Sequence, residues 1–255
     1  MTRRWITWGI IGAVVAAMIG CDRQDASTPS NDDAVAAEPG DIPSLQARLD
    51  EKKAAFAQQA PAELRDTFER GVAEVRDSGV TDNMLKVGAQ APAFSLPNGE
   101  NEQVELATLL QDGPVVLVWY RGGWCPYCVI QLNAYQELLP EFAKLRATVV
   151  GIAPERPVKV RETAATNNLT FTLLSDKGNR VATEYGLTYT LPEAVQAAFK
   201  GRIDFEDYNG DTSAQLPLSA TFVIDADGTV RFAEADADYK KRAEPADVIA
   251  VLRDL

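Results

Sequence analysis

Two cysteines three positions apart are the side chains of this sequence with the clearest capacity for chemistry. They lie in the stretch Arg121 to Cys128, R-G-G-W-C-P-Y-C, directly after the apolar run Val115 to Tyr120. Two thiols at this spacing can hold a metal, close a structural disulfide or turn over as a redox pair. The chain of 255 residues contains three cysteines and no histidine. That composition restricts the choice.

A metal site is not expected, because it needs about two more soft or imidazole ligands than the pair supplies. The absence of histidine also excludes Ser-His-Asp and Cys-His triads and a haem held by histidine. We therefore expect no metal and no other cofactor. A purely structural disulfide remains open, although so short a loop would constrain little of the unfolded chain.

The local pattern favours a reactive pair. Pro126 suits the first position of a helix, which places Cys125 at the N-cap, where free backbone N–H groups and the helix dipole favour a thiolate. Arg121 lies four positions upstream and can add a positive charge. Cys128 falls in the first helical turn on the same side, within disulfide distance. The sequence thus predicts a redox-active Cys125–Cys128 disulfide, with Arg121 beside it.

Alternating strand and helix patterns position these residues. The six apolar residues Val115 to Tyr120 predict a buried strand, and Pro126 to Leu145 a helix with a bend at Pro140. Other expected elements are strands at 103–106, 148–153, 171–174, 218–225 and 230–233, and helices at 107–110, 158–168, 178–185, 192–199 and 245–255. Strands alternating with helices predict an α/β sandwich over residues 86–255.

The segment before this domain has three parts. Residues 1–21 combine two arginines, an apolar core of export-signal length and M-I-G-C, which resembles a bacterial lipobox with Cys21 as the lipidated residue. Residues 22–40 are small, polar and acidic, as in a flexible tether. Residues 41–85 show helical periodicity and predict a helical hairpin packed on the main domain. An uncleaved membrane anchor is the alternative for the first part. Both interpretations predict an extracytoplasmic (periplasmic) protein held to a membrane.

The cysteine motif and two other segments resemble one family. W-C-P-Y-C between a buried strand and a helix looks like the active site of thioredoxin-fold oxidoreductases. G-A-Q-A-P-A-F-S-L (88–96) and A-T-F-V-I-D-A-D-G (220–228) resemble hallmark segments of the alkyl hydroperoxide reductase and thiol-specific antioxidant (AhpC/TSA) family. The stretch W-Y-R-G-G-W-C-P-Y-C resembles its peroxiredoxin-like branch. The resemblance spans about residues 86 to 250, including Y-N-G-D (208–211) and D-Y-K-K-R-A-E-P (238–245), and implies a thioredoxin-like fold.

This resemblance leaves the first nucleophile open. Typical members carry a Pro-x-x-x-Thr-x-x-Cys loop, which by spacing puts Arg121 at the Pro, Cys125 at the Thr and Cys128 at the peroxidatic cysteine. Thioredoxins instead make the first cysteine the attacker, and the N-cap argument agrees, so we favour Cys125. The arginine that supports the peroxide site in the family is replaced here by Ser219. Arg121 is the local replacement.

Three functions are compatible with these residues. The family resemblance implies a thiol-dependent peroxidase that reduces hydroperoxides and is recycled by an external, thioredoxin-like thiol. The intact W-C-P-Y-C suits an extracytoplasmic oxidoreductase that reduces protein disulfides. A structural module with a permanently closed disulfide is the third. The net charge of −12 argues against nucleic acid as a partner.

Overall fold

The computed structural model describes residues 44–255 of the chain. The expected export signal, Cys21 and the tether lie outside the described residues. Between residues 44 and 255, no helix is both long and apolar enough to cross a membrane.

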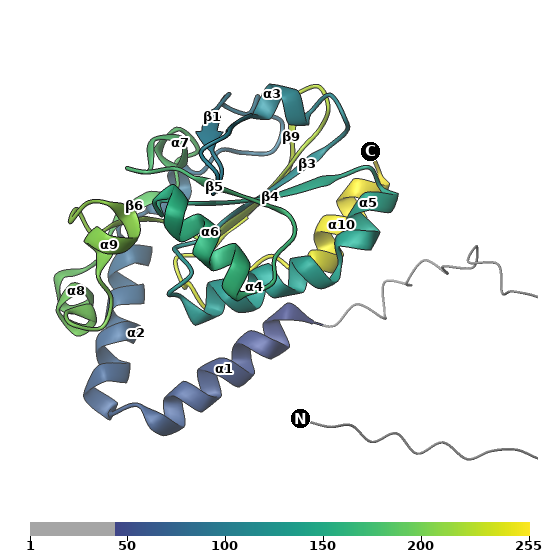
Figure 1. The fold of residues 1–255 in the computed structure, drawn as a ribbon. Coiled ribbons are helices and arrows are strands. Elements are labelled where there is room, and N and C mark those ends of the chain that lie inside the picture. Colours follow the sequence, from purple (N-terminus) through teal and green to yellow (C-terminus); the bar gives the residue numbers. More distant parts are fainter. Residues whose placement is uncertain (1–43) are drawn as a thin grey trace, which may run out of the picture. The chain divides into compact units, whose positions relative to one another are not determined.

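A sheet forms the centre of the domain (Figure 1). It has five strands in the order β5-β4-β3-β8-β9. β3 pairs in parallel with β4, and β4 pairs in parallel with β5. β8 runs antiparallel to both β3 and β9. These strands span Val115–Trp119 (β3), Thr148–Ala153 (β4), Thr172–Ser175 (β5), Ala220–Ile224 (β8) and Val230–Ala235 (β9). With its helices, this mixed sheet confirms the predicted thioredoxin-like α/β fold.

Strand β3 lies in the middle of the sheet because both of its faces are apolar. Side chains of a strand point alternately to the two faces. Val116 and Val118 pack into the core on one face, whereas Leu117 and Trp119 pack into the core on the other. All residues of β3 are fully buried. The end of this strand is therefore a rigid platform for the residues that follow it.

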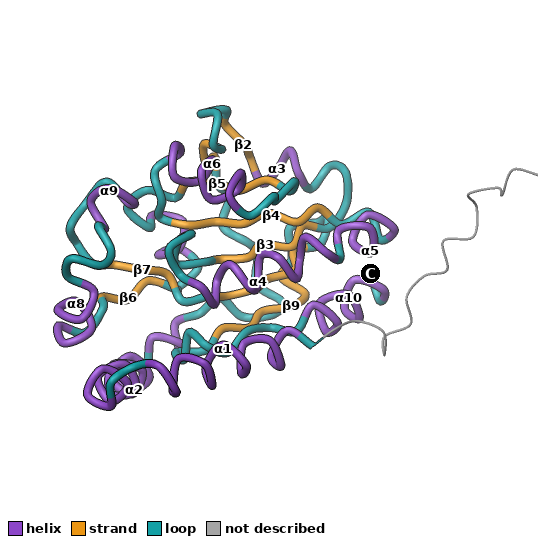
Figure 2. Tube along the Cα trace, turned by 60° about the horizontal axis from the view of Figure 1, so that its bottom comes forward, coloured by secondary structure: helices purple, strands orange, loops and turns teal. Residues whose placement is uncertain are grey.

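Helices cover both faces of the sheet. On one face lie α4 and α10, with α1 alongside them (Figure 2). Apart from the two helices of an insertion described below, the helices of the domain are α3 (Leu106–Leu109), α4 (Pro126–Glu137), α5 (Leu139–Lys144), α6 (Pro157–Thr166), α7 (Arg180–Glu184) and α10 (Pro245–Arg253). The bend predicted at Pro140 takes the form of a break at Leu138, where α4 ends before α5 begins.

The N-terminal extension consists of α1 (Leu45–Gln59), α2 (Ala62–Asp77) and a short 3-10 turn, Val80–Asn83. The expected pair of helices is present, but its form as a hairpin is wrong. α1 packs along α4, and α2 packs along α8 (Glu193–Phe199), so the two helices diverge from Pro61 (Figure 1). They diverge because their apolar side chains, Leu49 on α1 and Val72 on α2, are buried against different parts of the domain.

An insertion between β5 and β8 builds the end of the molecule next to α2. It contains the predicted helix α8 and, beyond what the sequence indicated, a second helix and a two-stranded sheet. These are α9 (Phe205–Asn209), β6 (Thr188–Thr190) and β7 (Gln215–Pro217). A further two-stranded sheet joins β1 (Ser95–Pro97) to β2 (Gln103–Glu105).

Candidate active site

Cys125 occupies the N-cap of α4, as the sequence predicted. Its backbone is extended, and Pro126 occupies the start of the helix. Its N–H donates to the carbonyl of Gly122 at 3.0 Å, which closes the turn between β3 and α4. Both Cys125 and Cys128 are free thiols with 0% exposure. The two sulfurs therefore lie beneath the protein surface.

The two glycines before Trp124 are required by close contacts. A Cβ at Gly122, whose φ is +149°, would come 2.3 Å from Nε1 of Trp124. A Cβ at Gly123 would come 2.1 Å from Oγ1 of Thr163 on α6. The turn can approach these side chains only without side chains of its own. This explains the G-G in the motif.

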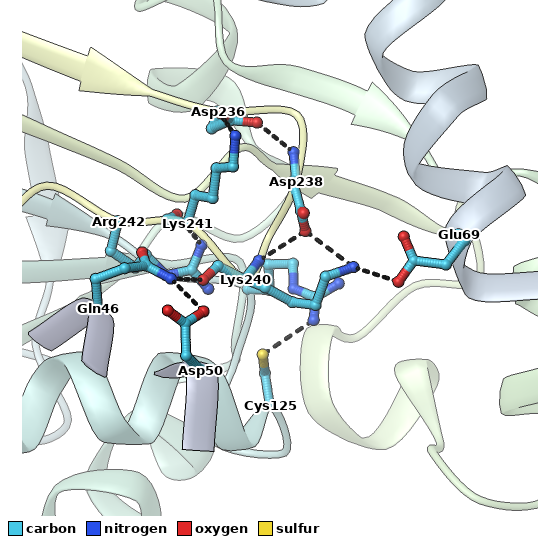
Figure 3. Close-up of polar contacts among 10 residues, drawn as sticks. Gln46, Asp50, Glu69, Cys125, Asp236, Asp238, Lys240, Lys241 and Arg242 are labelled. Carbon is cyan, nitrogen blue, oxygen red and sulfur yellow. Dashed lines mark hydrogen bonds and ion pairs between the residues drawn. The ribbon is translucent and has the colours of Figure 1, made fainter. Parts of the chain in front are cut away.

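Arg121 is buried beside the cysteines, with 3% exposure. Its Nη2 donates to Sγ of Cys125 at 3.0 Å, the contact marked at the sulfur in Figure 3, and its backbone N–H donates to Sγ of Cys128 at 3.4 Å. The guanidinium carbon lies 4.0 Å from the ring centre of Tyr239. Nε has no hydrogen-bond partner within the described chain. The structure thus brings together the three residues that the sequence singled out in this loop.

These contacts separate the pKa values of the two thiols. Burial alone raises the pKa of Cys125, but the hydrogen bond from Cys128 and the charges of Arg121 and Arg242 outweigh it. The pKa of Cys125 consequently lies well below its usual value. Burial, the hydrogen bond to Cys125 and the negative charge of Cys125 hold the pKa of Cys128 well above its usual value. Of the two thiols, Cys125 is the one whose surroundings favour ionisation, which is the direction that the N-cap argument expected.

Arg242 is a residue of the candidate site that the sequence analysis missed. It reaches the pair from the segment between β9 and α10, where Figure 3 labels it with Lys240 and Lys241. Its Nη2 donates to Sγ of Cys128 at 3.5 Å, and its exposure is 5%. One sequence feature could have indicated this residue. It is the basic run K-K-R (240–242) in an otherwise acidic chain, within a segment that already resembled the family.

A buried carboxylate, Glu155, holds the other side of the cysteine loop. It accepts hydrogen bonds from the backbone N–H of Gly123 at 2.9 Å, from the hydroxyl of Tyr120 at 3.0 Å and from the hydroxyl of Thr163. Burial raises the pKa of Glu155 above its usual value, against the effect of these donors. Tyr120 is therefore a partner of this carboxylate as well as a packing residue.

Ser219, at the position where the resemblance led us to expect an arginine, is buried, and its hydroxyl has no hydrogen-bond partner among the described residues. The expectation that Arg121 is the local replacement was incomplete. Arg121 and Arg242 together place two guanidinium groups against the sulfurs.

An apolar pocket with a volume of about 130 Å³ lies over Arg121. Its walls come from the extension, the cysteine loop, the insertion and the β9–α10 segment. The rings of Phe68 and Phe199 lie 5.4 Å apart, and those of Trp124 and Phe199 lie 5.7 Å apart. The aromatic residues that line it are Phe56, Phe68, Trp124, Tyr127, Phe199 and Tyr239.

Comparison with known proteins finds one family and consistent relatives. Residues 87–233 match the AhpC/TSA family. The chain is similar to peroxiredoxin Bcp of Escherichia coli, with 32% identity over 58% of this chain and 84% of that protein. It is also similar to a putative peroxiredoxin of Mycobacterium tuberculosis, with 34% identity over 57% of this chain and 82% of that protein. The crystal structure of peroxidoxin BcpB from Mycobacterium tuberculosis superposes with a TM-score of 0.54 at 27% identity, covering 67% of this chain and 98% of that one.

Proposed function

The chain belongs to the AhpC/TSA family, and on that premise we propose that it is a thiol-dependent peroxidase that uses Cys125 as nucleophile and Cys128 as resolving thiol. The observation that carries this proposal is the buried sulfur of Cys125, to which the guanidinium of Arg121 donates a hydrogen bond at 3.0 Å. Thiolates are the species that attack peroxides. Its relatives are named peroxiredoxins, which supports the same reaction.

In the first step the sulfur of Cys125 attacks the terminal oxygen of a hydroperoxide. The O–O bond breaks, Cys125 becomes a sulfenic acid and the remaining oxygen leaves as an alkoxide or hydroxide that takes up a proton. Cleavage is faster when donors stabilise the charge that develops on the leaving oxygen. Arg121 can supply such a donor from its Nε, which has no hydrogen-bond partner in residues 44–255.

In the second step the sulfur of Cys128 attacks the sulfenic sulfur of Cys125. An S–S bond forms, and the hydroxyl of the sulfenic acid leaves as water after protonation. Two electrons from an external dithiol of the thioredoxin type then reduce the disulfide to the starting thiols. No resident cofactor enters this cycle.

The pocket favours small substrates over protein disulfides. Both sulfurs are fully buried, and the aromatic walls stand over Arg121. A dry cavity of about 150 Å³ lined by apolar side chains holds benzene, so this one suits a hydroperoxide with a compact apolar group. Direct attack on a folded protein's disulfide would need these walls to move.

The cellular location rests on the sequence alone. The basic residues, apolar core and M-I-G-C of residues 1–21 support export and lipid attachment at Cys21. Cys21→Ser is expected to release the protein from membranes or leave its signal uncleaved. Normal cleavage with persistent membrane association would contradict this part of the proposal.

The peroxidase is tested by stopped-flow oxidation of the reduced Cys21→Ser protein with hydrogen peroxide and cumene hydroperoxide. Tryptophan fluorescence reports the reaction, since Trp124 lies in the cysteine loop. We expect oxidation much faster than that of a free thiol, lost in Cys125→Ser and arrested at a dimedone-reactive sulfenic acid in Cys128→Ser. Oxidation at the rate of a free thiol, with rapid exchange against a protein disulfide, would instead make the protein a disulfide reductase.

A further inference from the structure

Among the described residues, the hydrogen bond that Arg242 donates to a cysteine goes to Cys128, although its charge also acts on Cys125. Its Nη2 lies 3.5 Å from Sγ of Cys128, and its Nη1 donates to the carbonyl of Lys241 at 3.3 Å. The side chain is 95% removed from solvent, and its Nε has no hydrogen-bond partner within the described chain. In residues 44–255, none of the ion pairs to a carboxylate involves this guanidinium. A buried cation without a carboxylate partner needs another source of negative charge.

We propose that Arg242 is a catalytic residue of disulfide closure, where its guanidinium stabilises the thiolate of Cys128 as that sulfur attacks the sulfenic acid of Cys125. The proposal rests on the peroxidase function above and assigns its two arginines to different steps. Arg121 serves the cleavage of the O–O bond at Cys125, and Arg242 serves the formation of the S–S bond by Cys128.

The charges around Cys128 change in the direction that this division requires. In the reduced protein the negative charge of Cys125 opposes ionisation of Cys128 and shares the positive charge of Arg121 and Arg242. Once Cys125 is a neutral sulfenic acid, that opposition ends and both guanidinium groups act on Cys128 alone. The remaining titratable groups that face this sulfur, Tyr120, Glu155 and Tyr189, supply no positive charge.

The closure step balances with the groups in place. The thiol of Cys128 gives up its proton, its sulfur attacks, and the hydroxide that leaves Cys125 takes up a proton to become water. The sulfenic sulfur is reduced and the Cys128 sulfur is oxidised as the S–S bond forms. The guanidinium of Arg242 keeps its charge throughout and neither donates nor accepts an electron.

The segment that carries Arg242 is held in place by ion pairs of Lys240, two residues before it. Lys240, 6% exposed at its side chain, pairs with Asp238 at 3.1 Å and with Glu69 of α2 at 3.1 Å. The backbone N–H of Lys240 also donates to the carboxylate of Asp238. Figure 3 shows this cluster between α2 and the sulfur of Cys125. A fixed segment keeps the guanidinium at the sulfur during the reaction, so that little reorganisation is needed.

The test separates the two steps in Arg242→Gln, Arg242→Lys and the matched control Arg231→Gln, all in the Cys21→Ser chain. Arg231 lies on β9 and is exposed, with its ion pairs to Asp225 and Asp227 away from the sulfurs. Stopped-flow mixing with cumene hydroperoxide gives the rate of sulfenic acid formation. Quenching with dimedone at increasing times, followed by mass analysis, gives the rate of closure.

We expect Arg242→Gln to slow closure at least tenfold at neutral pH, which corresponds to about 1.4 kcal/mol. The midpoint of the pH dependence of closure should move to higher pH by at least one unit, because the pKa of the attacking thiol rises. Sulfenic acid formation should change less than closure, and Arg242→Lys should recover part of the loss. Arg231→Gln should match the parent. Closure that is unchanged within twofold, or slowed equally with the first step at an unshifted pH midpoint, would overturn the proposal.

A second probe keeps this result independent of the peroxidase. Dithiodipyridine is a small neutral disulfide that forms a mixed disulfide with Cys125 and releases one thiopyridone, and attack by Cys128 then releases the second. The second release should be slowed in Arg242→Gln with the same shift in pH. If the parent protein reacts with peroxide no faster than a free thiol, the proposed peroxidase function is refuted. The rate of the second thiopyridone release still decides the role of Arg242. An unslowed second release would refute that role.

Discussion

Replacing Arg121 by glutamine should raise the pKa of Cys125 by at least two units. Its Nη2 lies 3.0 Å from the sulfur, and both groups are buried. Two unit charges at that distance interact by about 5.5 kcal/mol at an effective dielectric constant of about 20. Because one pKa unit corresponds to about 1.36 kcal/mol, full loss would amount to about four units. In this variant the charge of Arg242 still lowers the pKa of Cys125. We therefore expect an increase smaller than four units and take two units as its lower bound.

The assay is the pH dependence of iodoacetamide alkylation in a chain with Cys21→Ser and Cys128→Ser. Serine at 128 retains a hydroxyl that can donate to Cys125, and it leaves one thiol to titrate. Arg231→Gln in the same background is the control for loss of a positive charge elsewhere. The parent midpoint should lie well below the usual value for cysteine, and the Arg121→Gln midpoint should be higher.

A midpoint that moves by less than half a unit in Arg121→Gln, at intact far-UV circular dichroism, would refute the electrostatic account. The thiolate would then owe its stability to the backbone N–H groups at the start of α4 rather than to the guanidinium. A parent midpoint at the ordinary cysteine value would refute the assignment of Cys125 as the thiolate altogether.

Three further outcomes follow from other contacts. Glu155→Ala should lower the free energy of unfolding by about 3 kcal/mol in denaturant unfolding, because the buried groups that donate to Glu155 lose their acceptor. A loss below about 1 kcal/mol would contradict this. Burial raises the pKa of Glu155, so the free energy of unfolding of the parent, measured relative to that of Glu155→Gln, should fall as the pH rises above 4.5. A difference in unfolding free energy that stays constant with pH would contradict this. Phe68→Ala should lower the rate with cumene hydroperoxide about fivefold more than with hydrogen peroxide, from about 1 kcal/mol of apolar contact. Phe232 lies on β9 and does not line this pocket, so Phe232→Ala is the control. Equal loss with both peroxides, or the same selectivity change in Phe232→Ala, would exclude the pocket as the cause.

The strand, turn and helix around the cysteines could be predicted because local rules govern them. Six apolar residues bounded by Gly-Pro and Gly-Gly specify a buried strand, and Pro126 specifies the start of a helix. The position of Cys125 at the N-cap follows from these two facts. The local sequence from Val115 to Cys128 is therefore enough to predict the backbone geometry of the motif.

Arg242 and the arrangement of α1 and α2 could not be predicted in the same way. Arg242 is 114 positions from Cys128, and its approach depends on how β8 and β9 return across the sheet. The apolar periodicity of α1 and α2 shows that each buries a face, but not which neighbour covers it. Glu244 holds the start of α1 through the N–H groups of Leu45 and Gln46, a contact across about 200 positions. Long-range contacts of this kind have no local signature.

The two buried guanidinium groups also bear on the energetics of recycling. Interactions that stabilise the thiolate stabilise the reduced form, and by a thermodynamic cycle they make the disulfide a stronger oxidant. Each tenfold gain in favour of the dithiol raises the reduction potential by about 30 mV. When the disulfide closes, Arg121 and Arg242 lose the negative charge that faces them, so the oxidised protein holds two uncompensated buried cations. The charges that serve the two oxidative steps thus also favour reduction of the disulfide by the external dithiol.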